Sequence, residues 1–242
     1  MAVRWGAGGY LRINSAAPAA QGYLPSDNPA SLIAWFRMGV GVTITGAGVS
    51  SWADQSGNGN DLLQGTDGNR PDYDGTAIIT FNGSADFLKC SAFTLNQPTQ
   101  VSILASQVTW TNNDTLWGGN VGAQVGLTQR VISPNVALFA GNVEFANSDM
   151  TVGAFHAVTS LLSGASSSIV VDANAATTGS PGTTAMAGFT LGSRGDGLAG
   201  WSNIAVKEII LRNVDDATIR ANTEMRLTYV SGWGHGGLTV SG

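Results

Sequence analysis

The chain has 242 residues, 43% of them hydrophobic, with 33 glycines, 11% charged residues and a net charge of −5. This apolar content excludes a disordered chain, and the lack of a basic run excludes the clustered Lys and Arg that nucleic-acid binding needs. No apolar run approaches the ~20 residues that span a bilayer and no secretion signal is visible, so we expect no nucleic-acid and no membrane partner.

Residues 1–30 are rich in Ala, Gly and Pro, which predicts an extended arm or a short first strand followed by a linker. This arm carries Trp5, Tyr10, Leu11 and Tyr23, too many apolar groups for an idle tail. Such a segment gains stability only by lying against its own domain or a neighbouring subunit. We therefore predict that it serves in assembly.

Two turn-rich corners follow. The first reads Ser-Trp-Ala-Asp-Gln-Ser-Gly-Asn-Gly-Asn-Asp-Leu at 51–62, and the second reads Ile-Ile-Thr-Phe-Asn-Gly-Ser-Ala-Asp-Phe-Leu at 78–88. Short apolar runs between turn residues indicate antiparallel strands. The same pattern predicts strands at 32–38, 100–110, 131–139 (interrupted by Pro134), 155–162, 166–173, 189–193 and 204–212. We expect Cys90 to be a small buried hydrophobe in one such run.

The spacing of apolar residues changes after residue 212, from that of a strand to that of a helix. Asp215 is a suitable N-cap, and Ile219, Leu227, Tyr229 and Val230 fall on one side of a helical wheel. We predict a single short helix that ends at Gly232.

The order of these motifs resembles the laminin-G-like, concanavalin A-type jelly roll of the lectin and glucanase family. That family opens with Trp-x-Asp-x-Ser-Gly-x-Gly-Asn, matched at 52–60, and carries a Trp-His-x-Val strand before Leu-x-Val-Asp-Gly. Here Phe155 replaces the tryptophan and Ala173 the last glycine. The resemblance implies an all-β, two-sheet antiparallel jelly-roll sandwich over 31–235, with the N-terminal arm, one short C-terminal helix and a Gly-rich tail at 236–242.

Catalytic residues are not evident. Retaining enzymes of this family carry Glu-x-Asp-x-x-Glu, which brings two carboxyl groups to ~5–5.5 Å, and that motif is absent from this sequence. The three glutamates, Glu144, Glu208 and Glu224, lie far apart in the chain. We therefore predict that the protein is not an enzyme.

Polar loops with tryptophans are the candidate glycan site. Trp110, Trp117 and Trp201 lie beside Gly-rich or Asn-rich loops, and Asn113 and Asp114 could bond sugar hydroxyls. The alternative is that each tryptophan belongs to the core or to a subunit interface.

The opening corner could also bind calcium. Asp54, Asn58, Asn60 and Asp61 supply the oxygen ligands that this ion prefers. The alternative, which we favour, is that these side chains bond the local backbone of a turn. We expect no other cofactor.

The resemblance extends to compact laminin-G-like domains of bacteriophage structural proteins. It implies a non-enzymatic virion surface or decoration protein, made in the host cytoplasm, that binds itself or other virion proteins. The alternatives are a carbohydrate-binding adhesion module and a glycan-cleaving enzyme.

Overall fold

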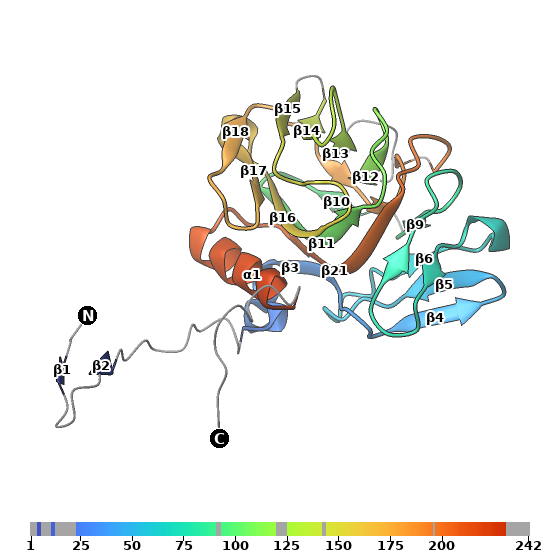
Figure 1. Cartoon of the computed structure of the whole chain (residues 1–242), viewed down its shortest axis with the longest axis horizontal. Helices are drawn as coiled ribbons and strands as arrows, with labels where there is room; N and C mark the ends of the chain where they lie inside the picture. Colours follow the sequence, from blue (N-terminus) through green and yellow to red (C-terminus); the bar gives the residue numbers. More distant parts are fainter. Residues whose placement is uncertain are drawn as a thin grey trace.

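The computed structural model describes residues 4–5, 11–12, 23–90, 93–119, 125–141, 144–195 and 197–230. Its strands are antiparallel throughout and form two large sheets (Figure 1). The nine-stranded sheet has the order β15 (Glu144–Asn147), β14 (Val136–Ala140), β13 (Val125–Gln129), β12 (Thr115–Gly118), β20 (Thr190–Leu191), β9 (Leu88–Lys89), β6 (Leu62–Leu63), β5 (Gly48–Trp52) and β4 (Val42–Thr45).

The eight-stranded sheet is the second layer. Its order is β18 (Thr177–Gly179), β17 (Ser167–Val171), β16 (Phe155–Leu162), β11 (Thr99–Gln107), β21 (Ile204–Arg212), β8 (Ile79–Thr80) and β7 (Asp72–Tyr73), and β3 (Leu32–Phe36) also pairs with β21. Two small pairs accompany the sheets: β1 (Arg4–Trp5) with β2 (Leu11–Arg12), and β10 (Thr94–Leu95) with β19 (Met186–Ala187).

Alternation of side chains along the strands builds the core between the two sheets. On β11, Val101, Ile103 and Ala105 belong to the main hydrophobic cluster, because successive side chains of a strand point to opposite faces. Trp52 and Trp117 of the nine-stranded sheet join the same cluster and are fully buried. The predicted all-β class is therefore confirmed. Cys90 also lies in this cluster, as predicted, and burial raises the pKa of its thiol to about 11.

The helix α1 (Ala217–Val230) covers the other face of the eight-stranded sheet, beside β3 and β16 (Figure 1). Leu227 packs there against a second cluster that includes Trp35 and Ile210. The buried carboxylate of Glu208 accepts hydrogen bonds from Trp35 Nε1 at 2.9 Å and from Arg226 Nε at 2.7 Å. This charged, hydrogen-bonded contact fixes the helix on the sheet.

The predicted short C-terminal helix is confirmed, but its predicted cap was wrong by one residue. The carboxylate of Asp216 accepts the backbone N–H of Thr218 and of Ile219, as an N-cap does. Asp215 instead pairs with Arg220 at 3.2 Å. The predicted end at Gly232 and the predicted tail lie outside the described residues.

Residues 23–31 lie against the end of β21. The buried guanidinium of Arg212 donates to the backbone oxygens of Asn28 and Pro25 and to the hydroxyls of Ser31 and Tyr23. The segment contains the short 3-10 helices η2 (Pro25–Asp27) and η3 (Pro29–Ser31). Of the other arm residues, Trp5 pairs with Leu11 across β1 and β2, and Tyr10 lies outside the described residues.

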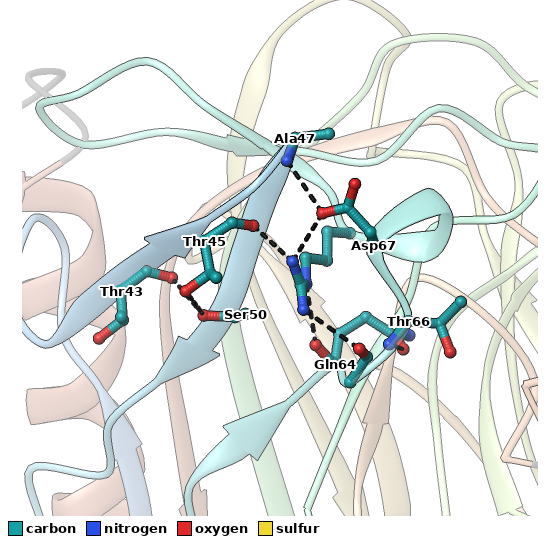
Figure 2. A network of polar contacts seen from close by, with 9 residues as sticks. Thr43, Thr45, Ala47, Ser50, Gln64, Thr66 and Asp67 are labelled. Carbon is teal, nitrogen blue, oxygen red and sulfur yellow. Dashed lines mark hydrogen bonds and ion pairs between the residues drawn. The ribbon is translucent and has the colours of Figure 1, made fainter.

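A polar network ties the β4–β5 hairpin to the segment 64–67 that follows β6 (Figure 2). Arg70 donates to the carbonyl oxygens of Thr45, Gln64 and Gly65 and pairs with the Asp67 carboxylate at 2.6 Å. The same carboxylate accepts the backbone N–H of Ala47. Gly46 is required between them, since its φ is +63° and a Cβ would lie 2.1 Å from Asp67 Oδ1.

Candidate functional site at one end of the sheets

Three loops meet at one end of the molecule, and we call them the loop rim: residues 108–114, 130–135 and 198–203. They connect the ends of β11, β12, β13, β14 and β21. Backbone N–H groups join them, since Asn113 donates to Gln129 O and Thr115 donates to Gly200 O, each at 2.8 Å. Val131 N also donates to Asn112 Oδ1 at 3.0 Å. The rim therefore gathers residues that are far apart in the sequence.

Two fully buried amide side chains, Gln107 and Gln129, hold the rim from below. Gln129 Nε2 donates to Gln107 Oε1 at 2.7 Å and to Thr109 O at 2.9 Å, while its Oε1 accepts the N–H of Thr111. Gln107 Nε2 donates to Pro134 O and to Met150 O. Buried polar groups that are satisfied in this way rigidify a site.

Two of the predicted tryptophans lie on the rim. Trp110 is partly buried, and its Nε1 donates to Asn135 O at 2.9 Å. Trp201 is also partly buried and forms a β-bridge with Thr115, the residue that follows Asp114 in the sequence. Four of the five predicted glycan candidates, namely Trp110, Asn113, Asp114 and Trp201, therefore come together in the fold.

Trp117 does not join them. Its side chain is 0% exposed and stacks on Phe189 with ring centroids 6.1 Å apart. The pairing of β12 with both β13 and β20 places it inside the main cluster. A ring without an exposed face cannot stack on a sugar, so the alternative that this tryptophan belongs to the core holds here.

Asp114 is the electrostatically unusual residue of the rim. Burial raises the pKa of its carboxyl group from 3.8 to about 6, and a hydrogen bond with the Thr111 side chain lowers it in part. Its neighbour Asn113 has a φ of +77° and accepts a hydrogen bond from the Arg130 guanidinium. A carboxyl group with such a pKa can donate a proton in weakly acidic solution.

Large apolar side chains are exposed along the same loops. Val131 is 71% exposed, Ile132 is 64% exposed and Leu198 is 75% exposed. Exposed apolar side chains next to polar and aromatic groups are typical of binding surfaces.

In the corner at 51–62, the oxygens of the candidate calcium ligands accept hydrogen bonds from nearby groups of the protein. Asp54 Oδ1 accepts the N–H groups of Trp35 and Ser56, and Oδ2 accepts Ser56 Oγ–H and Asn60 N–H. Asp61 Oδ1 accepts the N–H of Asp54. The amide groups of Asn58 and Asn60 donate to carbonyl oxygens at the start of β3. These contacts fit the turn interpretation of the candidate calcium ligands.

Metal ligands do not cluster elsewhere in the part of the chain that the structure describes, where no group of three His, Cys, Asp or Glu side chains could hold an ion. In the same residues, no helix is long and apolar enough to cross a membrane. The side chain of Glu144 lies outside the described part.

His156 at the start of β16 links two neighbouring side chains. Its Nδ1 lies 2.5 Å from Asp172 Oδ2, and its Nε2 lies 2.9 Å from Thr151 Oγ1. The sequence of contacts Thr151–His156–Asp172 resembles the arrangement that activates a hydroxyl nucleophile. The nearby N–H groups of Thr151 and Gly153, however, donate to Asp149 O and Gln107 O and are not available to bind an oxyanion. We therefore infer that these contacts hold the loop before β16 in place.

No known protein-family model matches the chain, and no curated protein matches it. Solved structures do. A Trypanosoma rangeli sialidase in complex with sialic acid has a TM-score of 0.57 at 16% identity, over 84% of this chain and 33% of that chain. A mutant of that sialidase displaying trans-sialidase activity has a TM-score of 0.61 at 16% identity, over 88% and 35%. An arabinofuranosidase complexed with arabinofuranosyl-α-1,2-xylobiose has a TM-score of 0.52 at 14% identity, over 76% and 51%.

The chain spans about a third of the length of these sialidases and about half of that of the arabinofuranosidase. At such identities the likeness shows the fold. The matches nevertheless contradict two predictions from the sequence, namely that the protein is a bacteriophage decoration protein and that it is not an enzyme, because these structures of the same fold are glycosidases. The first prediction depended on a general style of composition, and the second on the absence of one family's motif. Neither feature is specific to a function.

Proposed function

We propose that this chain acts on glycans, that it binds them at the loop rim, and that it contributes to glycoside cleavage there. The observation that carries the proposal is the convergence of Trp110, Trp201, Asn113 and Asp114 from separate loops at one end of the sheets. We also propose that the strands of the two sheets are connected in the order of a concanavalin A-like jelly roll.

Sugar recognition needs flat apolar surfaces beside hydrogen-bonding groups. The two tryptophans are partly exposed, and the ring of Trp110 is held by its bond to Asn135 O. The backbone bonds of the rim and the buried Gln107–Gln129 pair fix these rings before any ligand arrives. A rigid site loses less conformational entropy when it binds.

Asp114 is our candidate for the proton donor. Glycosidases use a carboxylic acid with a raised pKa to protonate the leaving oxygen, and burial gives Asp114 a pKa of about 6. Retaining and inverting mechanisms both need a second carboxyl group beside the acid. The causes of the shifted pKa of Asp114 are burial and the hydrogen bond with Thr111, and no neighbouring charge is among them. Among the described residues we therefore assign only the role of the acid.

The matched structures suggest the substrates to test. Their ligands include sialic acid and an arabinofuranosyl xylobiose, so the panel should contain sialylated and arabinofuranosyl oligosaccharides. We expect product release from at least one substrate, a rate that falls as the pH rises through about 6, and loss of the activity in Asp114→Asn.

The matched control is Asp72→Asn, because Asp72 is an exposed aspartate on β7, in the other sheet. It should retain the wild-type rate. Full activity in Asp114→Asn would remove Asp114 from the reaction, and no product from any substrate would refute cleavage by this chain.

A further inference from the structure

Exposed apolar side chains gather on the loop rim. Of the ten large apolar side chains that are exposed in the described part of the chain, four belong to the rim: Val108, Val131, Ile132 and Leu198. A fifth, Val152, forms a β-bridge with Gln107, the residue before Val108. Single exposed apolar side chains are ordinary on a protein surface, but a group of them at one end of the molecule marks a place where something binds.

Val131 and Ile132 are adjacent at the end of the loop 130–135, and we call them the apolar tip. Backbone hydrogen bonds close this loop on itself. Arg130 N donates to Asn135 O at 3.1 Å, Ile132 N donates to Arg130 O at 2.9 Å, and Asn135 N donates to Ile132 O at 2.8 Å. The loop therefore holds both side chains of the tip at the surface.

Val131 stands in an unfavourable backbone conformation. Its φ is +69°, a left-handed value that is an outlier for a β-branched residue. The N–H of Val131 is held by Asn112 Oδ1 at 3.0 Å, and such strain persists only where the surroundings fix it. The side chain is 71% exposed and so gains little from packing within the described chain. Neither the backbone nor the core therefore accounts for a valine here, whereas an apolar ligand does.

The apolar tip lies next to the proposed acid. Gln129, two residues before Val131, donates its backbone N–H to Asp114 O at 2.7 Å. Asn112, which holds the N–H of Val131, is two residues before Asp114. The acid of a glycosidase protonates the oxygen that leaves with the aglycone. The aglycone therefore lies beside Asp114, within the same pair of loops as the tip.

We propose that the apolar tip binds the aglycone of the glycoside, and that this aglycone is an apolar group such as an alkyl chain. The inference rests on the proposed function and names its substrate class, glycosides with an apolar leaving group. Removal of apolar surface from water on both sides drives this contact. A sugar as leaving group would instead bring hydroxyl groups that need hydrogen-bond partners, and the side chains of Val131 and Ile132 have none to offer.

Pairs of glycosides that differ only in the aglycone test the subsite. The probes are the methyl and octyl glycosides of arabinofuranose and of sialic acid, titrated calorimetrically below the concentration at which the octyl compounds form micelles. Wild type should bind an octyl glycoside about tenfold more tightly than its methyl counterpart, because burial of roughly two methylene groups supplies that factor. Ile132→Ser should lower this ratio of affinities towards one.

Ile44→Ser is the matched control, because Ile44 is also an exposed isoleucine, 54% exposed, but lies on β4 outside the rim. It should keep the wild-type ratio. Val131→Asn separates binding from stability, since asparagine adopts a positive φ more readily than valine does. This variant should lower the ratio while its melting temperature stays equal or rises. A lower melting temperature would assign the valine to the fold.

Four results would overturn the subsite. The first is equal affinity of wild type for methyl and octyl glycosides, and the second is an unchanged ratio in Ile132→Ser. The third is octyl binding that survives Trp110→Ala, because the tip would then bind alkyl chains without a sugar. The fourth is a dimer in light scattering that Ile132→Ser converts to a monomer, because the tip would then be a subunit interface.

The proposed function and the subsite fail in different ways. If wild type binds methyl glycosides or array glycans but shows no preference for the octyl group, the subsite alone fails. If it neither binds nor cleaves any glycan or glycoside, the proposed function fails and the subsite fails with it.

Discussion

The loop rim and the corner at 51–62 contain similar residues, yet their aspartates have opposite surroundings. Asp54 in the corner accepts four hydrogen bonds, three of them from backbone N–H groups. Asp114 on the rim is partly desolvated, and its pKa is raised to about 6. A carboxylate whose oxygens already accept hydrogen bonds from the protein has a structural role. A partly desolvated carboxyl group near the surface can still bind a ligand or exchange a proton.

The two kinds of tryptophan extend this comparison and give the largest expected effect. Trp117→Ala should destabilise the protein by ~3–5 kcal/mol, because it empties a fully buried site in the core. Trp110→Ala should cost much less stability, since its ring is partly exposed, and should abolish glycan binding. Urea unfolding of both variants checks this, and equal losses would contradict the distinction between rim and core.

Asp54→Ala should have the next largest effect and lower the free energy of unfolding by ~3 kcal/mol, because the backbone N–H groups of Trp35, Ser56 and Asn60 lose a charged acceptor. The measurement is again urea unfolding. Asn58→Ala is the milder companion, since Asn58 is exposed and its amide donates to Leu32 O and Ile33 O. If Asp54→Ala unfolds at the same urea concentration as wild type, the hydrogen bonds of the Asp54 carboxylate do not stabilise the corner.

Asp114→Asn should change the pH dependence of stability. Because the folded-state pKa lies above the ordinary value of 3.8, the protonated carboxyl group contributes stability below the ordinary pKa, and that contribution is lost as the pH rises through about 6. The asparagine has no such loss, so the variant should gain stability relative to wild type between pH 4 and pH 8. A constant difference across that range would contradict the raised pKa.

Calcium should have the smallest effect. The corner oxygens already accept hydrogen bonds, so we expect the same melting temperature in CaCl₂ and in EDTA. A ligand that binds the folded state must raise this temperature, and a rise in CaCl₂ that Asp54→Asn and Asp61→Asn remove would restore the corner as a calcium site.

Much of the fold was predictable because strand and helix periods are local. The runs 155–162 and 204–212 are strands over the predicted residues, and the change of period after Arg212 marks the helix. The cap was misplaced because two adjacent aspartates offer the same chemistry, and contacts with Thr218 and Ile219 decide between them.

The site was predictable only in part. Trp110 and Trp201 stand beside polar loops in the sequence as in the fold. Trp117 also precedes a polar, Gly-containing segment in the sequence, but it is buried by β13 and β20, which lie apart from it in the chain. The Gln107–Gln129 pair joins residues of two different sheets, and nothing in the sequence marks either residue. The predicted non-enzymatic function failed because a general style of composition and the absence of one family's motif carry little information about chemistry.

Glycan binding by wild type, Trp110→Ala and Asn58→Ala on one array tests the central claim most directly. If the rim binds sugar and the corner is structural, wild type and Asn58→Ala retain the same glycans, and Trp110→Ala retains none while keeping a near wild-type melting temperature. Retention by Trp110→Ala, or its loss in folded Asn58→Ala alone, would contradict the assignment of the sugar site to the loop rim.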